Sequence, residues 1–144
     1  MPGDVEVVRV DREAILELRA QVLGDPPTLS GDLAPATRHW AAVLDGAIVG
    51  CVSVMRLRGL ALRGMAVALE HRRQGIGASM LRVVCAEVEA DMWCNARIEA
   101  VPFYSHMGWV GVGPRFDLQD RGLHRRMIWT LPPVEGRLHR ERSL

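Results

Sequence analysis

The chain has 144 residues, which is enough for one domain with one hydrophobic core and too few for two. Hydrophobic residues make up 49% and charged residues 24%, as in an ordinary globular protein. The formal net charge of +1 gives no overall attraction to nucleic acid. No apolar run reaches the roughly 18 residues of a membrane span, and the N-terminus lacks a signal-peptide pattern. We therefore expect a cytoplasmic protein with neither a nucleic-acid nor a membrane partner.

Two features of the composition limit the chemistry. All 18 basic residues are arginine, which excludes a lysine nucleophile and a lysine Schiff base. The three cysteines, Cys51, Cys85 and Cys94, are odd in number and lack the Cys-x-x-Cys spacing of a zinc site. We expect buried, reduced thiols and no bound metal.

The first half of the chain predicts one helix among short strands. Residues 5–10 are β-branched and read as a strand, and apolar residues from Ile15 to Val22 recur at helical spacing. Residues 24–39 form a long loop, a kind of segment that is commonly functional. Strands are then predicted over residues 39–44, 47–57 and 60–69, with a two-residue hairpin turn at Asp45-Gly46 and a second turn at Arg58-Gly59.

The second half predicts a strand–helix–strand crossover followed by two more strands. The helix begins after Gly75 and carries an apolar stripe at four-residue spacing. A strand near residues 95–100, a short helix, and strands near residues 110–118 and 125–131 follow. The predicted fold is α/β (α+β), with a mixed central sheet of six to seven strands and helices on both faces. The domain should span residues 1–133, leaving residues 134–144 as a basic tail.

Residues 60–79 carry most of the functional information. An apolar strand there ends in a charged bend and then in Gly75-Ile76-Gly77, which opens a helix. A glycine-rich helix start presents backbone N–H groups and the positive end of the helix dipole to an anion. Gly64, inside the preceding strand, predicts a bulge or a close backbone approach. The segment predicts a phosphate site, and a pyrophosphate is the expected ligand.

The spacing of this segment selects among phosphate-binding motifs. A P-loop needs Gly-Lys-Ser/Thr, which a chain without lysine cannot supply. A dinucleotide fingerprint starting at Gly75 would require a small residue where Met80 stands. The pattern Arg/Gln-x-x-Gly-x-Gly/Ala fits, with Arg72, Gly75 and Gly77.

At this point the chain resembles the GCN5-related N-acetyltransferase (GNAT) superfamily. The segment Met65-Ala66-Val67 occupies the place of its Leu-Ala-Val strand, and residues 103–109 resemble its Phe-Tyr-x-x-x-Gly-Phe motif. Residues 94–97 and 122–127 resemble a bacterial branch related to ElaA. The proline that usually follows the Leu-Ala-Val strand is replaced by Ala68-Leu69.

The resemblance implies acetyl-CoA as co-substrate and a GNAT fold in which a splayed strand pair forms the CoA cleft. The implied catalytic acid is Tyr104, and the candidate acceptor-binding residues are Asp32, His39 and His124. The implied cofactor-binding residues are Met65, Ala66, Val67, Arg72, Arg73, Gln74, Gly75, Ile76, Gly77, Ala78 and Asn95.

The implied function is acetyl transfer to a primary amine by direct attack in a ternary complex. The alternative is a non-catalytic acyl-CoA-binding regulatory or sensor module of the same fold. The acceptor stays open between a small metabolite, an antibiotic, a polyamine and a peptide N-terminus, and a homodimer is possible. The general base also stays open, and the candidates are Asp32, His39, Glu99, His106 and His124.

Overall fold

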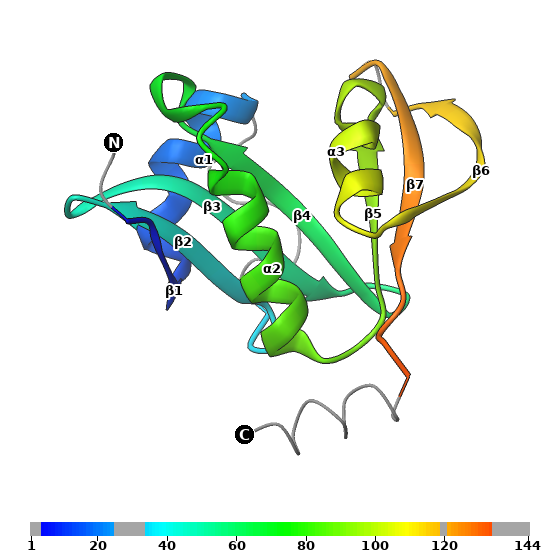
Figure 1. The fold of residues 1–144 in the computed structure, drawn as a ribbon, viewed down its shortest axis with the longest axis horizontal. Helices are drawn as coiled ribbons and strands as arrows, with labels where there is room; N and C mark the ends of the chain where they lie inside the picture. Colours follow the sequence, from blue (N-terminus) through cyan, green and yellow to red (C-terminus); the bar gives the residue numbers. More distant parts are fainter. Residues whose placement is uncertain (1–3, 25–33, 119–120, 134–144) are drawn as a thin grey trace.

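The computed structural model describes residues 4–24, 34–118 and 121–133, and these form a seven-stranded mixed sheet (Figure 1). The strand order is β1-β2-β3-β4-β5-β7-β6, and every pairing is antiparallel except β4 with β5. The strands are β1 (Glu6–Val10), β2 (Arg38–Leu44), β3 (Ala47–Arg56), β4 (Leu60–Val67), β5 (Met92–Arg97), β6 (Val110–Asp117) and β7 (Leu123–Trp129). The predicted mixed sheet and its strand number are confirmed. The helices are α1 (Leu16–Leu23), α2 (Ile76–Val88) and α3 (Val101–His106), with 3-10 turns η1 (Arg12–Ile15), η2 (Leu69–His71) and η3 (Ile98–Ala100).

The helices cover both faces of the sheet, as predicted. Apolar residues of α2 and α3 share one buried core with the sheet, whereas η1 and α1 pack on a second, smaller core that includes Ala41, Cys51 and Ala66. Figure 1 shows α1 and α2 on opposite sides of strands β2 to β4. Ile76, Met80, Leu81, Val84 and Val88 are the buried residues of α2, so its predicted apolar stripe is confirmed.

Both predicted turns form: two residues connect Leu44 to Ala47, and three residues connect Arg56 to Leu60. Asp45 and Gly46 have φ of 51° and 81°, and Arg58 and Gly59 have φ of 49° and 94°. Two successive left-handed residues match the right-handed twist of the flanking strands and close a tight hairpin. These turns set the antiparallel order of β2, β3 and β4.

Strands β4 and β5 meet at one end and separate toward the other. Their register contains a single pair, Ala61 with Trp93, near the start of both strands. The Trp93 indole N–H donates to the carbonyls of Leu57 (2.9 Å) and Arg58 (3.1 Å) and so ties β5 to the β3–β4 turn. The two strands therefore diverge toward their carboxyl ends, which confirms the splayed pair.

Two predicted boundaries differ from the structure. Strand β5 begins at Met92 and ends at Arg97, not over residues 95–100. Met92, Cys94 and Ala96 are buried in alternation, a strand period that starts earlier than expected, and η3 takes up residues 98–100. Strand β4 ends at Val67, because η2 begins at Leu69.

The acidic C-terminal half of α2 has a specific explanation at Glu87. Its carboxylate accepts a hydrogen bond of 3.0 Å from the indole N–H of the buried Trp40. The bond satisfies a polar group that would otherwise be buried without a partner, which offsets the unfavourable placement of an acid near a helix C-terminus.

No helix in the described part of the chain is long and apolar enough to span a membrane.

Candidate active site between strands β4 and β5

A cavity of about 560 Å³ occupies the space between the diverging strands. Strand β4 contributes residues 61–65 and β5 contributes residues 93–97 to its wall. Of the residues predicted for the site, the cavity brings together Met65, Arg72, Asn95, Tyr104 and His124. The open end of the strand pair is where an α/β sheet normally binds its ligand.

The predicted phosphate segment has the backbone conformation of an anion-binding loop. Arg73 and Gly75 both adopt left-handed conformations, with φ of 64° and 79°. Gly75 is the N-cap of α2, and no side chain caps this helix end. Residues 72–75 are exposed, so N–H groups at this helix start are accessible to an anion from outside.

Other residues of this segment have different surroundings. Ile76 is buried in the core and can serve a ligand only through its backbone. A Cβ at Gly77 would lie 3.5 Å from the Phe103 ring, which places the first turn of α2 against α3. The Arg72 side chain donates from Nε to the carbonyl of Val67 at 3.3 Å and thereby joins the loop to the end of β4.

Strand β4 contains the irregularity predicted at Gly64. The pairing of β3 with β4 shifts register between Cys51 and Ser53, and Gly64 has φ of 66°. A bulge leaves one residue outside the regular ladder, so its backbone groups can turn toward a ligand. Met65 lines the cavity just beyond the bulge, whereas the Ala66 side chain is buried in the smaller core.

Asn95 lies on β5 with a defined amide orientation. Its Oδ1 accepts a 2.9 Å hydrogen bond from Arg126 Nε, and the Arg126 guanidinium stacks 4.0 Å from the centroid of Trp93. Because arginine can only donate, the carboxamide oxygen is assigned by chemistry. The Asn95 NH₂ group is therefore the part left to donate toward the cavity.

Tyr104 lies on α3, buried, where it lines the cavity and also packs against aromatic neighbours. Its ring makes edge-to-face contacts with Phe103 (5.2 Å) and Trp109 (5.4 Å). Burial, and after it the neighbouring Cys94 thiol, raise the pKa of the Tyr104 hydroxyl well above its ordinary value. Tyr104 is therefore a neutral hydroxyl at physiological pH, and both a chemical and a packing role are compatible with its position.

His124 is buried on β7, where one of its ring nitrogens is committed. Its Nδ1 lies 2.8 Å from the carbonyl oxygen of Gly122. A carbonyl only accepts, so Nδ1 carries the proton and, in the neutral ring, Nε2 keeps its lone pair. A cavity-lining imidazole in this tautomer can accept a proton.

The other two predicted acceptor residues are not placed at the cavity. His39 is buried on β2, and its Nδ1 lies 2.7 Å from the Ser53 hydroxyl, which in turn accepts from Arg19 Nη2 at 2.9 Å. These three residues lie on the α1 side of the sheet and do not line the cavity. Asp32 lies outside the described residues.

Besides the predicted Arg72, three further basic residues of the cavity wall were not predicted from the sequence. Arg63, Arg97 and Arg121 all line it. A recess of about 440 Å³ adjoins the cavity and shares Arg97, Ala100 and Arg121 with it. A signal for Arg97 was present in the sequence, because it lies two residues after Asn95 and residues two apart in a strand share a face.

The cysteines have the surroundings of inert thiols. Cys51, Cys85 and Cys94 are free, and Cys51 and Cys94 are buried. Burial raises the pKa of Cys51 and of Cys85 to about 11, and that of Cys94 to about 12. Among the described residues, no group of three or more His, Cys, Asp or Glu side chains is placed to hold a metal ion.

Residues 12–130 match the acetyltransferase (GNAT) domain family, and the chain belongs to that family. This class of protein is an N-acyltransferase enzyme that uses an acyl-CoA donor, and the splayed pair and the loop before α2 agree with that class.

Individual relatives support the same class. The chain is 26% identical to the uncharacterized N-acetyltransferase YitI of Bacillus subtilis (strain 168), over 88% of this chain and 97% of that protein. The crystal structure of Escherichia coli ElaA shares the fold with a TM-score of 0.74 at 16% identity, over 87% of this chain and 99% of ElaA. An aminoglycoside 6'-N-acetyltransferase solved with coenzyme A shares it with a TM-score of 0.71 at 16% identity, over 89% and 98% of the two chains. The ElaA match agrees with the predicted branch.

Proposed function

We propose that the protein is an acetyl-CoA-dependent N-acetyltransferase that transfers the acetyl group directly to a primary amine in a ternary complex. The observation that carries this proposal is the cavity at the splayed strands, which extends from the loop before α2 to Tyr104 and His124. Such an arrangement provides an anion site, a channel and proton-transfer groups in one connected volume.

The cofactor would lie along the α2 and α3 side of this cavity. Backbone N–H groups of residues 72–78 would bind the pyrophosphate, and Arg72 and Arg73 would add side-chain charge. Backbone groups of Met65, Ala66 and Val67 beyond the β4 bulge would pair with the pantetheine arm, which extends like an added strand. A β4 N–H would polarise a carbonyl of the cofactor.

The acceptor would enter from the opposite face of the sheet. Arg97 and His124 are directly paired between β5 and β7, and directly opposed residues of an antiparallel pair point to the same face. Cys94 and Ala96 alternate with Asn95 and Arg97 and are buried in the core that contains α3. The acceptor side is therefore the side of His124, across the sheet from α2 and α3.

The reaction would proceed by attack of the neutral amine on the thioester carbonyl carbon. The new bond is N–C, the broken bond is C–S, and the departing thiolate takes a proton. His124, with Nε2 as acceptor, is our proposed route for the proton lost by the amine. Tyr104 is the proposed donor toward the thiolate sulfur.

A covalent acyl-cysteine route is disfavoured by the thiols. The thiolate is the nucleophilic form of cysteine, and burial keeps Cys94, the cysteine that lines the cavity, protonated at neutral pH. Direct transfer requires no such nucleophile.

The testing experiment measures thiol release from acetyl-CoA across a library of primary amines, followed by initial-velocity kinetics on the best acceptor. We expect amine-dependent release and intersecting double-reciprocal plots, as for a ternary complex. No release with any amine would overturn the proposed function. Parallel plots with an acetylated enzyme detected by mass spectrometry would overturn direct transfer alone.

A further inference from the structure

We propose that the acceptor is a small amine that also carries a carboxylate, in the manner of an amino acid, and that Arg97 and Arg121 bind this carboxylate. This inference rests on the proposed function and names the substrate class of the same site. Polycationic acceptors, such as polyamines and aminoglycosides, are the alternatives that it rejects.

The wall of the cavity between β4 and β5 carries an excess of positive charge. The cavity is lined by Arg63, Arg72, Arg97 and Arg121 and by no aspartate or glutamate among its described lining residues. In the adjoining recess, Glu99 is the one acidic residue among those that line it. A wall with this excess of positive charge attracts an anionic group and repels a polyamine.

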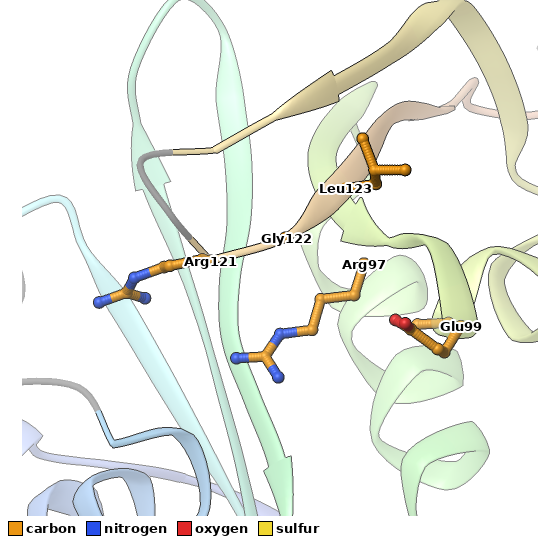
Figure 2. Close-up of a pocket in the computed structure, with 6 residues that line it drawn as sticks. Arg97, Glu99, Arg121, Gly122 and Leu123 are labelled. Atoms are coloured by element: carbon orange, nitrogen blue, oxygen red, sulfur yellow. The ribbon is translucent and has the colours of Figure 1, made fainter.

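Arg97 is available to bind a carboxylate. Its side chain is exposed, and within the described residues neither Arg97 nor Glu99 has an ion-pair partner. Figure 2 shows the Arg97 and Arg121 guanidinium groups extending to the same side, while Leu123 points away from them. A guanidinium offers several N–H donors in a planar fork that matches a carboxylate.

The carboxylate-binding residue Arg97 and the proton-accepting residue His124 lie close together. Arg97 and His124 are direct cross-strand partners, so their Cβ atoms lie about 4.5–5.5 Å apart. A single small molecule can therefore place its carboxylate at Arg97 and its amine near His124 at the same time. An amino acid is such a molecule.

Arg97 and Arg121 also line the adjoining recess, and no residue of the predicted phosphate loop before α2 lines that recess. Nearby positive charge also favours the uncharged form of an amine by lowering the pKa of its ammonium. The same arginines would thus bind the acceptor and help to supply its reactive form.

The test compares each amino acid with its own α-carboxamide, which keeps the amine and removes the negative charge. We would measure kcat/KM by thiol release for the common L-amino acids, their amides, spermidine and an aminoglycoside. We expect at least one amino acid to exceed its amide about tenfold or more, as a charge-assisted hydrogen bond allows.

The variant Arg97→Gln should lower the acid-to-amide ratio about tenfold and change the KM for acetyl-CoA less than twofold. Arg56→Gln is the matched control, since Arg56 is an exposed arginine of β3 that lines neither the cavity nor the recess, and this variant should keep the acid-to-amide ratio.

Equal rates for acids and amides, or spermidine as the best acceptor, would overturn the inference and leave the proposed function intact. A raised KM for acetyl-CoA in Arg97→Gln with an unchanged ratio would assign Arg97 to the cofactor and also overturn it. No turnover with any amine would overturn the proposed function itself, and the inference with it.

Discussion

At the scale of single residues, Tyr104 combines two roles that one substitution can separate. Its ring packs against Phe103 and Trp109, and the residue also lines the cavity. A thiol has an ordinary pKa near 8.5, so its thiolate already leaves readily, and the raised pKa of Tyr104 makes full proton donation less favourable. The hydroxyl should therefore contribute near the low end of the usual range for acid catalysis.

We expect Tyr104→Phe to lower kcat by roughly 10- to 100-fold while the Kd for acetyl-CoA stays within twofold. The ring and most of its packing are retained, so the melting temperature should change little. Steady-state kinetics and calorimetry would measure both quantities. A kcat within twofold of the unmodified enzyme would show that water or the substrate protonates the thiolate.

His39, Ser53 and Arg19 form a buried hydrogen-bonded group whose contribution to stability can be measured. The Ser53 hydroxyl accepts from Arg19 Nη2 and also forms a 2.7 Å hydrogen bond with His39 Nδ1, so one hydroxyl serves two buried partners. Removing it with Ser53→Ala leaves both partners with one bond fewer and should lower the free energy of unfolding by about 2 kcal/mol. Urea denaturation measures this loss, and Ser105→Ala, at an exposed serine of α3, is the control that should change little. Equal stability of the two variants would mean that water replaces the hydroxyl.

At the scale of elements, the loop before α2 depends on the conformation of Gly75. Its φ of 79° is strained for any residue with a side chain, by about 1–2 kcal/mol. Gly59 has a similarly left-handed φ of 94° in the β3–β4 turn, and at both positions an added Cβ would meet no atom within 4 Å. The two glycines therefore differ in their location relative to the predicted phosphate site and not in crowding.

We expect Gly75→Ala to weaken CoA binding at least tenfold, about 1.4 kcal/mol, because the loop must shift or its Cβ obstructs the phosphate. Gly59→Ala should cost comparable stability and leave the CoA affinity unchanged. Isothermal titration calorimetry with CoA distinguishes the two. Unchanged affinity in a folded Gly75→Ala protein would contradict the phosphate assignment.

At the scale of the whole molecule, the buried thiols make stability depend on alkaline pH. Burial raises the pKa of Cys51 and Cys85 from 9.0 to about 11, and that of Cys94 to about 12. The folded protein therefore holds these protons more tightly than the unfolded chain does. The stabilisation is fully present below pH 9 and is lost as pH rises through the folded values.

We expect the free energy of unfolding to fall between pH 9 and 11, by an amount of order 1 kcal/mol per pH unit for each of the buried thiols Cys51 and Cys94 and by less for the half-buried Cys85. Denaturant titrations at intervals of half a pH unit would measure this. The variant Cys51→Ala should flatten the slope, because one of the titrating groups is removed. A stability that is constant up to pH 11 would show that the buried thiols do not titrate in this range.

Much of the architecture follows from local patterns of the amino-acid sequence. Apolar and β-branched runs specified the strands, the four-residue stripe specified the core face of α2, and Asp45-Gly46 and Arg58-Gly59 specified the hairpins. Each of these signals arises within a few residues, where backbone conformation and side-chain period decide the outcome. The glycine-rich helix start after β4 and the bulge at Gly64 were predicted in the same way.

What the sequence by itself determined was therefore the set of elements, the family and the segment that opens α2. The tertiary structure decided which distant side chains meet. It paired Arg97 with His124 across β5 and β7 and placed Arg121 beside them, and it enclosed His39 with Ser53 and Arg19 on the far face. Local patterns cannot specify which distant side chains come into contact, because strand order and register are set by long-range pairing and core packing rather than by neighbours in the chain.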